Sequence, residues 1–266
     1  MTQSKRLIQV SGFVAAWMTI GWVFHLGTLG YQLAGVPLCL AFQRFVCNRS
    51  ITEAWVRESK TFQLDRIGAL LALALAAAPL LELVSAWATG NWTRRLFLAA
   101  AVAGAPAAAF AFRRMNREGW RCLLLCFCTA GLLGSAWTLS FCYARHDGIP
   151  FELWRLRILI DRWLLVVPLG FIAEEVAFRG VLDTHAHHPG DPRSFWSAFF
   201  ISALWGWWHV PILPTNPAWL GPVTYPLTHA LVGVPMCLYW RRSGNLVVPV
   251  VTHAFLDAVR DAFILV

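Results

Sequence analysis

Charged residues are scarce in this sequence. Of its 266 residues, 14% are charged and 58% are hydrophobic, whereas a soluble globular domain is about a quarter charged and less than half apolar. This shortage argues against a single water-soluble domain and against a disordered chain or a coiled coil. Lys5 and Lys60 are the only lysines, so arginine carries nearly all of the net charge of +8. In an apolar chain such a charge indicates basic loops at a membrane surface, and we predict no binding to nucleic acid.

The sequence also lacks the common motifs of nucleophilic and metal-dependent hydrolases. Neither GxSxG nor HExxH occurs in it, which argues against a serine-hydrolase elbow and against a zincin site. The seven cysteines are odd in number and lie mostly in apolar stretches. We interpret them as small buried thiols. The sequence therefore predicts no metal and no cofactor.

Long apolar segments are the main positive signal. A helix needs about 20 residues to cross about 30 Å of hydrocarbon, and no alternating ten-residue strands compete with this interpretation. Residues 10–46 are apolar but interrupted by Gly27, Gly30, Gly35 and Pro37, so they predict either one span with a surface helix or two spans. Clearer candidate spans follow at residues 67–89, 96–112, 122–144, 163–182, 195–213, 223–240 and 246–266. We expect an all-α, polytopic membrane helical bundle with about eight transmembrane helices, in a multi-pass protein of a bacterial inner or cell membrane.

Ionisable residues inside the apolar segments require an explanation, because a charge at the bilayer centre costs at least about 2.5–3.5 kcal/mol. Such residues concentrate in the last third of the chain. They occur in three of the last four apolar stretches. The first holds Glu174, Glu175 and Arg179, the next holds His209, and the last holds His253 and Asp257.

Helical spacing separates these side chains into faces. Glu175 and Arg179 are four residues apart and can pair on one face of a helix. Glu174 is rotated by about 100° from Glu175 and points elsewhere, so it is left for another partner. His253 and Asp257 also share a face. Hydrogen bonds that only hold a bundle together are the alternative interpretation, but titratable groups in three helices favour a functional site.

The chemistry available to this set is hydrolysis without a covalent intermediate. A carboxylate in a medium of low dielectric constant is a stronger base, and beside an imidazole it can deprotonate water. A second imidazole with a neighbouring polar group can stabilise a developing oxyanion. These groups suffice for cleavage of a peptide bond.

Three motifs in this region resemble those of the CAAX protease and bacteriocin-processing (CPBP) family, also known as abortive-infection-type membrane proteins. Glu174-Glu175-xxx-Arg179 resembles EExxxR. His209 closes a segment that resembles FxxxH, with Trp205 in place of Phe. His253-xxx-Asp257 resembles HxxxN, with Asp in place of Asn. The order and spacing fit over roughly residues 145–266.

The resemblance implies an intramembrane glutamate-type endopeptidase that acts on a membrane-associated protein or peptide. Glu174 would activate water with His209, while His253 and Asp257 would hold the oxyanion, and Glu175 and Arg179 would shape the site. The resemblance also divides the chain into residues 1–120, with N-terminal transmembrane helices and basic cytoplasmic loops, and residues 121–266, a CPBP-like catalytic helical core.

Several points stay open at this level. An ionised Asp257 cannot donate to an oxyanion, so it is either protonated or an acceptor that orients His253, and Arg260 is close enough in sequence to keep it ionised. The substrate could be a prenylated tail, a bacteriocin leader or a C-terminal sorting tail. A non-proteolytic immunity or scaffold protein of the same family is an alternative. A membrane transporter is another, although no internal repeat supports it.

Overall fold

The computed structural model describes residues 2–146, 148–149, 152–187, 194–213 and 217–264, and it is all-helical there apart from one isolated bridge between Val56 and Asn245. The predicted all-α class is therefore confirmed for this part of the chain. The helices are α1 (Gln3–Val23), α2 (Thr28–Ala41), η1 (Phe42–Val46), η2 (Ile51–Ala54), α3 (Arg66–Thr89), α4 (Trp92–Phe112), α5 (Arg117–Cys126), η3 (Phe127–Gly131), α6 (Leu132–His146), α7 (Leu153–Gly170), η4 (Val176–Asp183), α8 (Thr184–Ala186), α9 (Ser194–Trp208), α10 (Leu220–Ser243) and α11 (Val247–Phe263).

Among the residues that the structure describes, four helical segments are long and apolar enough to cross a membrane: Gln3–Val23, Arg66–Trp87, Trp92–Phe112 and Arg117–Ala144. These apolar helices indicate an integral membrane protein. The predicted count of about eight spans is not confirmed. The later helices fall short for physical reasons. Helix α9 has 15 residues and α11 has 17, while α7 carries four charged residues, Arg155, Arg157, Asp161 and Arg162.

The apolar region at residues 10–46 lies in α1, α2 and η1. Helix α1 ends at Val23, and α2 begins after a short turn at Thr28. Helix α2 has 14 residues and runs directly into the five residues of η1, and this stretch is not among the four candidate spans. The indole N–H of Trp17 donates to the carbonyl of Tyr31 at 2.8 Å, so the two helices are tied together beside the core.

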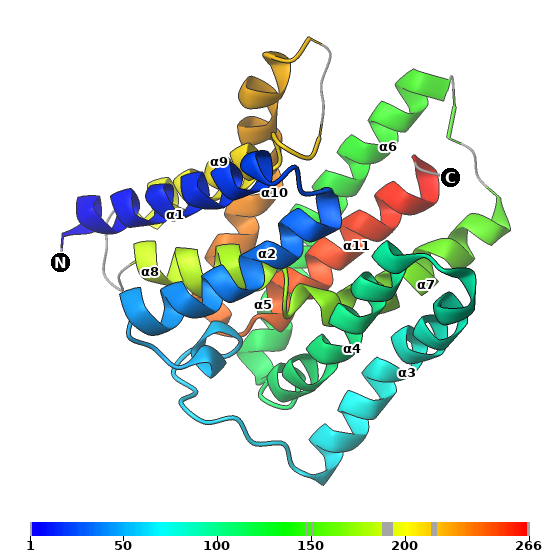
Figure 1. Ribbon diagram of the computed structural model, residues 1–266, viewed down its shortest axis with the longest axis horizontal. Coiled ribbons are helices and arrows are strands. Elements are labelled where there is room, and N and C mark those ends of the chain that lie inside the picture. The colour runs from blue at the N-terminus through cyan, green and yellow to red at the C-terminus, as the bar shows by residue number, and fades with distance from the viewer. Residues whose placement is uncertain (1, 147, 150–151, 188–193, 214–216, 265–266) are drawn as a thin grey trace.

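Helices α3 and α4 form an antiparallel pair at one side of the molecule (Figure 1). Asp65 caps the start of α3 by accepting from the backbone N–H of Gly68 at 2.7 Å. Arg113, at the end of α4, also donates to Asp65 and, with that N–H, holds the pKa of the carboxyl below its usual range. Gly104 allows a close approach of α4 to α7, because a Cβ at this position would collide with the carbonyl oxygen of Pro168.

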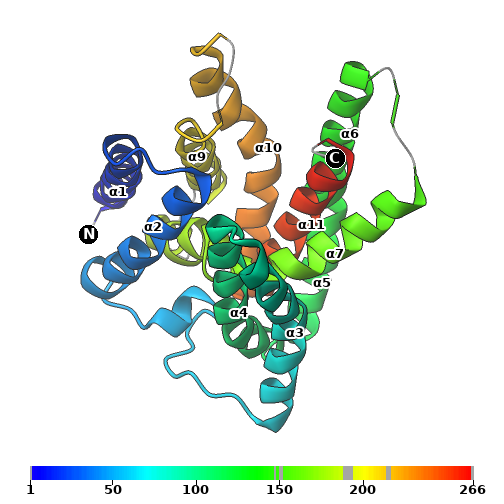
Figure 2. The same ribbon diagram turned by 45° about the vertical axis from the view of Figure 1, so that its right-hand side comes forward.

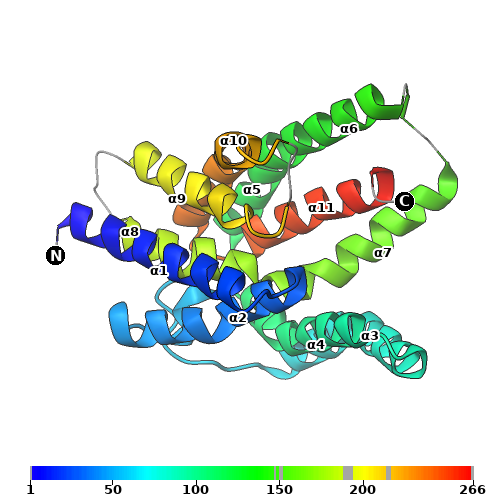
Figure 3. The same ribbon diagram turned by 45° about the horizontal axis from the view of Figure 1, so that its top comes forward.

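Helix α11 lies between α7 and α6, and the three run side by side (Figures 2 and 3). Helices α9 and α10 pack together on the other side of α11, and Gly206 allows their close contact, since a Cβ there would meet the carbonyl oxygen of Tyr225. Helix α1 lies across α8 and α9, and α2 contacts η4. This arrangement brings α2, η4, α9, α10 and α11 around one interior region.

Candidate active site

Glu174 lies where α7 gives way to η4. Helix α7 contains Pro168 and ends at Gly170, and residues 171–173 form a turn before the chain becomes helical again. The carbonyl of Phe171, released from the helix, accepts a hydrogen bond of 2.9 Å from the indole of Trp55. The prediction of one continuous helix over residues 163–182 was therefore wrong. The motif begins at a helix break, and wide-turn helical segments such as η4 are frequent at functional sites.

Glu175 and Arg179 form the ion pair that their spacing predicted. Nε of Arg179 lies 3.4 Å from Oε2 of Glu175, and both side chains are buried. The other carboxylate oxygen of Glu175 lies 2.9 Å from Nδ1 of His253. The Arg179 guanidinium stacks over the ring of Trp205 at 4.6 Å, an arrangement that adds to the stabilisation of a buried cation.

We expect the Glu175–Arg179 pair to be strongly non-additive. Glu175→Gln and Arg179→Leu each leave one buried charge without its partner, which typically costs about 3–5 kcal/mol. Glu175→Gln should be the more harmful, because in Arg179→Leu the remaining carboxylate still faces His253. The double variant should be more stable than the worse single variant. Thermal unfolding of the four proteins in detergent measures this, and strictly additive losses would show that the residues do not act as a pair.

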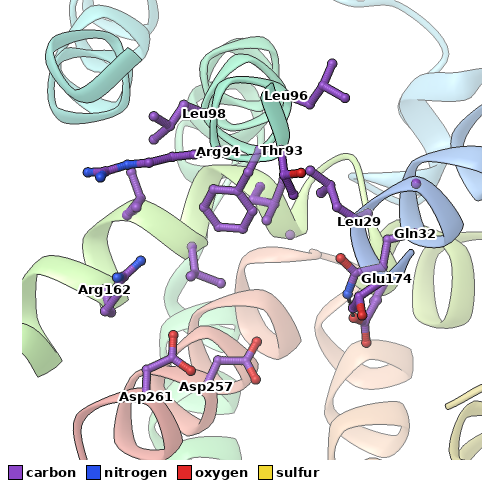
Figure 4. Close-up of a pocket in the computed structure, with 18 of the residues that line it drawn as sticks. Leu29, Gln32, Thr93, Arg94, Leu96, Leu98, Arg162, Glu174, Asp257 and Asp261 are labelled. Carbon is purple, nitrogen blue, oxygen red and sulfur yellow. Dashed lines mark hydrogen bonds between the residues drawn. The ribbon is translucent and has the colours of Figure 1, made fainter. Parts of the chain in front are cut away.

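Both carboxylate oxygens of Glu174 accept hydrogen bonds. Oε1 accepts from Nε2 of Gln32 at 2.7 Å, and Oε2 accepts from Nε1 of Trp205 at 2.9 Å. Oε2 also lies 3.6 Å from Nε2 of His209. Gln32 projects from α2 directly beside Glu174 (Figure 4). Glu174 is therefore separate from the Glu175–Arg179 pair and faces an imidazole, as the sequence predicted.

His209 lies immediately after the end of α9, with its ring fixed by the backbone. Its Nδ1 is 2.8 Å from the carbonyl oxygen of Trp205, and because a carbonyl only accepts, Nδ1 carries a proton. The neutral ring then presents its lone pair on Nε2 toward Glu174. His229 from α10 repeats this arrangement on the carbonyl of Tyr225 at 2.8 Å, and its ring centroid lies 4.3 Å from that of His209.

His253 and Asp257 lie on one face of α11, as predicted. Nε2 of His253 is 3.7 Å from Oδ2 of Asp257, longer than a hydrogen bond. Oδ1 of Asp257 is 2.7 Å from Nη1 of Arg260, which also contacts Asp261 at 3.0 Å. A guanidinium at this distance stabilises the ionised carboxylate. The contacts therefore favour an ionised Asp257 that pairs with Arg260 and lies beside His253 without a hydrogen bond to it.

Two cavities meet at these residues. The larger, of about 830 Å³, extends past α4 and α7 to Arg94 and Arg162 (Figure 4). The smaller, of about 500 Å³, lies among α6, α9, α10 and α11. The residues that line both are Thr28, Gln32, Glu174, His253, Asp257 and Arg260. Glu174 and His253 are thus accessible from two directions in an otherwise apolar interior.

The structure places all six predicted site residues in one cluster contributed by η4 and its N-terminal flank, the end of α9, and α11. Sequence reasoning missed Gln32 and His229. Both could have been found as polar side chains inside apolar stretches: the amide of Gln32 lies in residues 10–46, and the imidazole of His229 lies in residues 223–240. Within the described ranges, no group of three or more His, Cys, Asp or Glu side chains has an arrangement that could hold a metal ion.

Comparison with known proteins supports the resemblance. Residues 157–259 match the family model described as type II CAAX prenyl endopeptidase Rce1-like. No curated protein and no solved structure matches the chain significantly. The matched segment begins in α7 and ends in α11, so it contains all three motifs. Over this segment the chain is similar to the Rce1-like CAAX protease family, in agreement with the resemblance of its motifs.

Proposed function

We propose that the protein is an intramembrane endopeptidase that hydrolyses a peptide bond of a membrane-associated protein or peptide with water activated by Glu174. The observation that supports this most directly is the position of Glu174, whose carboxylate lies 3.6 Å from Nε2 of His209 at the junction of two cavities. A carboxylate and an imidazole at this separation can bind one water molecule between them and share its proton.

In this mechanism Glu174 removes the proton from the attacking water, and Nε2 of His209 accepts a hydrogen bond from the same water. The tetrahedral intermediate carries an oxyanion that needs a donor. When it collapses, the C–N bond breaks and the protonated Glu174 gives its proton to the leaving amine. His253 is the donor to the oxyanion in our proposal. Its Nδ1 is engaged by Glu175, whereas its Nε2 is not hydrogen-bonded to Asp257 and faces the cavities. Asp257, held by Arg260, supports the positive charge on His253.

A covalent serine mechanism has less support. Ser202 is the serine nearest in sequence to His209 within α9, but it is fully buried. Its hydroxyl donates to the carbonyl of Ala198 at 2.8 Å and contacts Cys237. A serine nucleophile needs a base within hydrogen-bond reach, and the contacts of Ser202 provide none. Water activated by a carboxylate remains the better proposal.

We further propose that the apolar helices beyond the four candidate spans complete a multi-pass bundle of about eight transmembrane helices in a bacterial inner or cell membrane. The burial of Glu175 and Arg179, with His253 partly buried beside them, supports this, since ion pairs shielded inside a bundle are tolerated in lipid. Residues 121–266 hold the catalytic core in this proposal. The region 1–120 also contributes to the site through Gln32, so it is more than an anchor.

An internally quenched peptide with a farnesylated C-terminal CAAX sequence is the first test, with purified protein in vesicles. Time-dependent cleavage by the wild-type protein and loss of cleavage in Glu174→Gln support the proposal. Comparative proteomics of membranes that contain wild-type or Glu174→Gln protein tests other substrates, because an uncut tail or leader should accumulate with the variant. Identical peptide profiles from the two membranes and no cleavage of the probe would favour an immunity, scaffold or transport role.

We expect peptidase activity to survive metal chelation. The proposed steps use only carboxylate and imidazole groups, so removal of free divalent cations leaves the mechanism intact. Activity on the quenched peptide should change less than about twofold after incubation with EDTA or with 1,10-phenanthroline, because no metal-bound water is part of the mechanism. Loss of activity that added zinc restores would instead assign His209, His229 or His253 as metal ligands.

A further inference from the structure

The Glu174 carboxylate is held by two side-chain donors from helices that are distant in sequence. Gln32 in α2 donates to Oε1 at 2.7 Å, and Trp205 in α9 donates to Oε2 at 2.9 Å. Each oxygen therefore receives one N–H and keeps a second lone pair for other partners. A glutamate side chain has three rotatable torsions, and two opposed donors restrict the orientation of its carboxylate.

We propose that Gln32 and Trp205 are positioning residues that form a clamp on Glu174 and aim its Oε2 at the water shared with His209. This inference rests on the proposed function of Glu174 as the base. A general base must lie within hydrogen-bond reach of the proton that it removes. A displacement of about 1 Å can cost about 10²-fold in rate. The clamp fixes the base before substrate enters either cavity.

The N–H of Trp205 is separable from the packing of its ring. The ring lies under the Arg179 guanidinium and meets the rings of His229 and His253 edge to face at 4.7 and 5.0 Å. A phenylalanine ring keeps most of this packing but has no donor. Trp205→Phe therefore removes the hydrogen bond to Glu174 with a small change in the surrounding contacts.

Gln32 is fixed in turn by its neighbour on α2. The hydroxyl of Tyr31 donates to the carbonyl oxygen of Trp208 in α9 at 3.0 Å, and the carbonyl of Tyr31 accepts from Trp17 in α1. These bonds hold α2 against α9, so the two arms of the clamp belong to helices that are themselves tied together. Gln32→Met removes the amide donor and preserves the approximate length of the side chain.

Helix α9 also offers a matched control. Trp208 lies three residues after Trp205 and is fully buried, but among the described residues its indole N–H has no hydrogen-bond partner. Its ring packs on Trp17, Tyr31 and Phe178. Trp208→Phe therefore makes the same chemical change in the same helix without removing a bond to Glu174.

The test measures kcat, KM and the unfolding temperature of wild type, Trp205→Phe, Gln32→Met and Trp208→Phe in vesicles with the quenched prenylated peptide. We expect kcat to fall about tenfold in Trp205→Phe and in Gln32→Met, because each loses one of two constraints on the base. KM should stay within about twofold, since neither donor contacts substrate in the proposal. Trp208→Phe should keep wild-type kcat.

The outcomes separate the clamp from the function on which it rests. Equal kcat in Trp205→Phe, Gln32→Met and wild type, while Glu174→Gln is inactive, would overturn the clamp and leave the proposed function intact. A rise in KM with unchanged kcat would assign the two residues to substrate contact and also overturn it. If Trp205→Phe lowers the unfolding temperature more than Trp208→Phe does, its loss of kcat could come from damaged packing. The kcat of Gln32→Met then decides whether the clamp exists. An active Glu174→Gln protein would overturn the function itself.

Discussion

Glu174→Gln should lower peptidase activity by at least about 10²-fold, because an amide cannot accept the proton of the attacking water. The substitution preserves side-chain size, and the amide can still accept a hydrogen bond through its oxygen. We therefore expect expression and the unfolding temperature in detergent to stay close to those of wild type. Cleavage of the quenched prenylated peptide by purified protein in vesicles gives the rate.

Glu118→Gln is the matched control for Glu174→Gln. Glu118 is an exposed carboxylate that pairs with Arg242, and it lines neither of the two cavities. Exposed pairs of this kind contribute about 0–1 kcal/mol, so this variant should keep full activity. Wild-type-like turnover by the Glu174→Gln protein would show that another group activates the water.

Asp257→Ala should lower kcat by about 10²–10³-fold, the usual cost of removing a group that supports an oxyanion site. The alanine variant leaves His253 without the carboxylate beside its Nε2 and frees Arg260 from one of its two partners. Asp257→Asn should keep substantial activity, because the amide oxygen can still accept from Arg260 and lie beside His253, although the supporting charge is lost. The rate constants of both variants on the quenched peptide measure the difference.

Asp261→Ala is the control for Asp257. It removes the other carboxylate on Arg260 without touching His253, and it should leave kcat nearly unchanged. The pH dependence of kcat separates the two roles of Asp257. An ionised acceptor predicts a rate that persists as the pH rises, whereas a protonated donor predicts that the rate falls when the carboxyl ionises. Equal activity of Asp257→Ala and wild type would remove Asp257 from the site.

The local geometry of the motifs followed from helical spacing. Glu175 and Arg179 pair across one turn because positions four apart share a face, and His253 and Asp257 lie together on α11 for the same reason. Spacing also indicated that Glu174 points away from Glu175. The break before Glu174 did not follow, because hydropathy is continuous over residues 163–182. The break is stabilised by Trp55, which is distant in sequence and whose indole N–H donates to the carbonyl of Phe171.

The sequence by itself determined that the chain is helical and membrane-embedded, since few charges and long apolar runs allow no other compact state, and it determined which ionisable residues are unusual. Only the tertiary structure decided which partners those residues have. Gln32 reaches Glu174 across 142 positions of sequence, and His229 meets His209 between two helices. Such contacts depend on how α2, α9 and α10 pack. That packing is set by the fit of small residues such as Gly206 against a neighbouring backbone, and periodicity along one helix does not specify it.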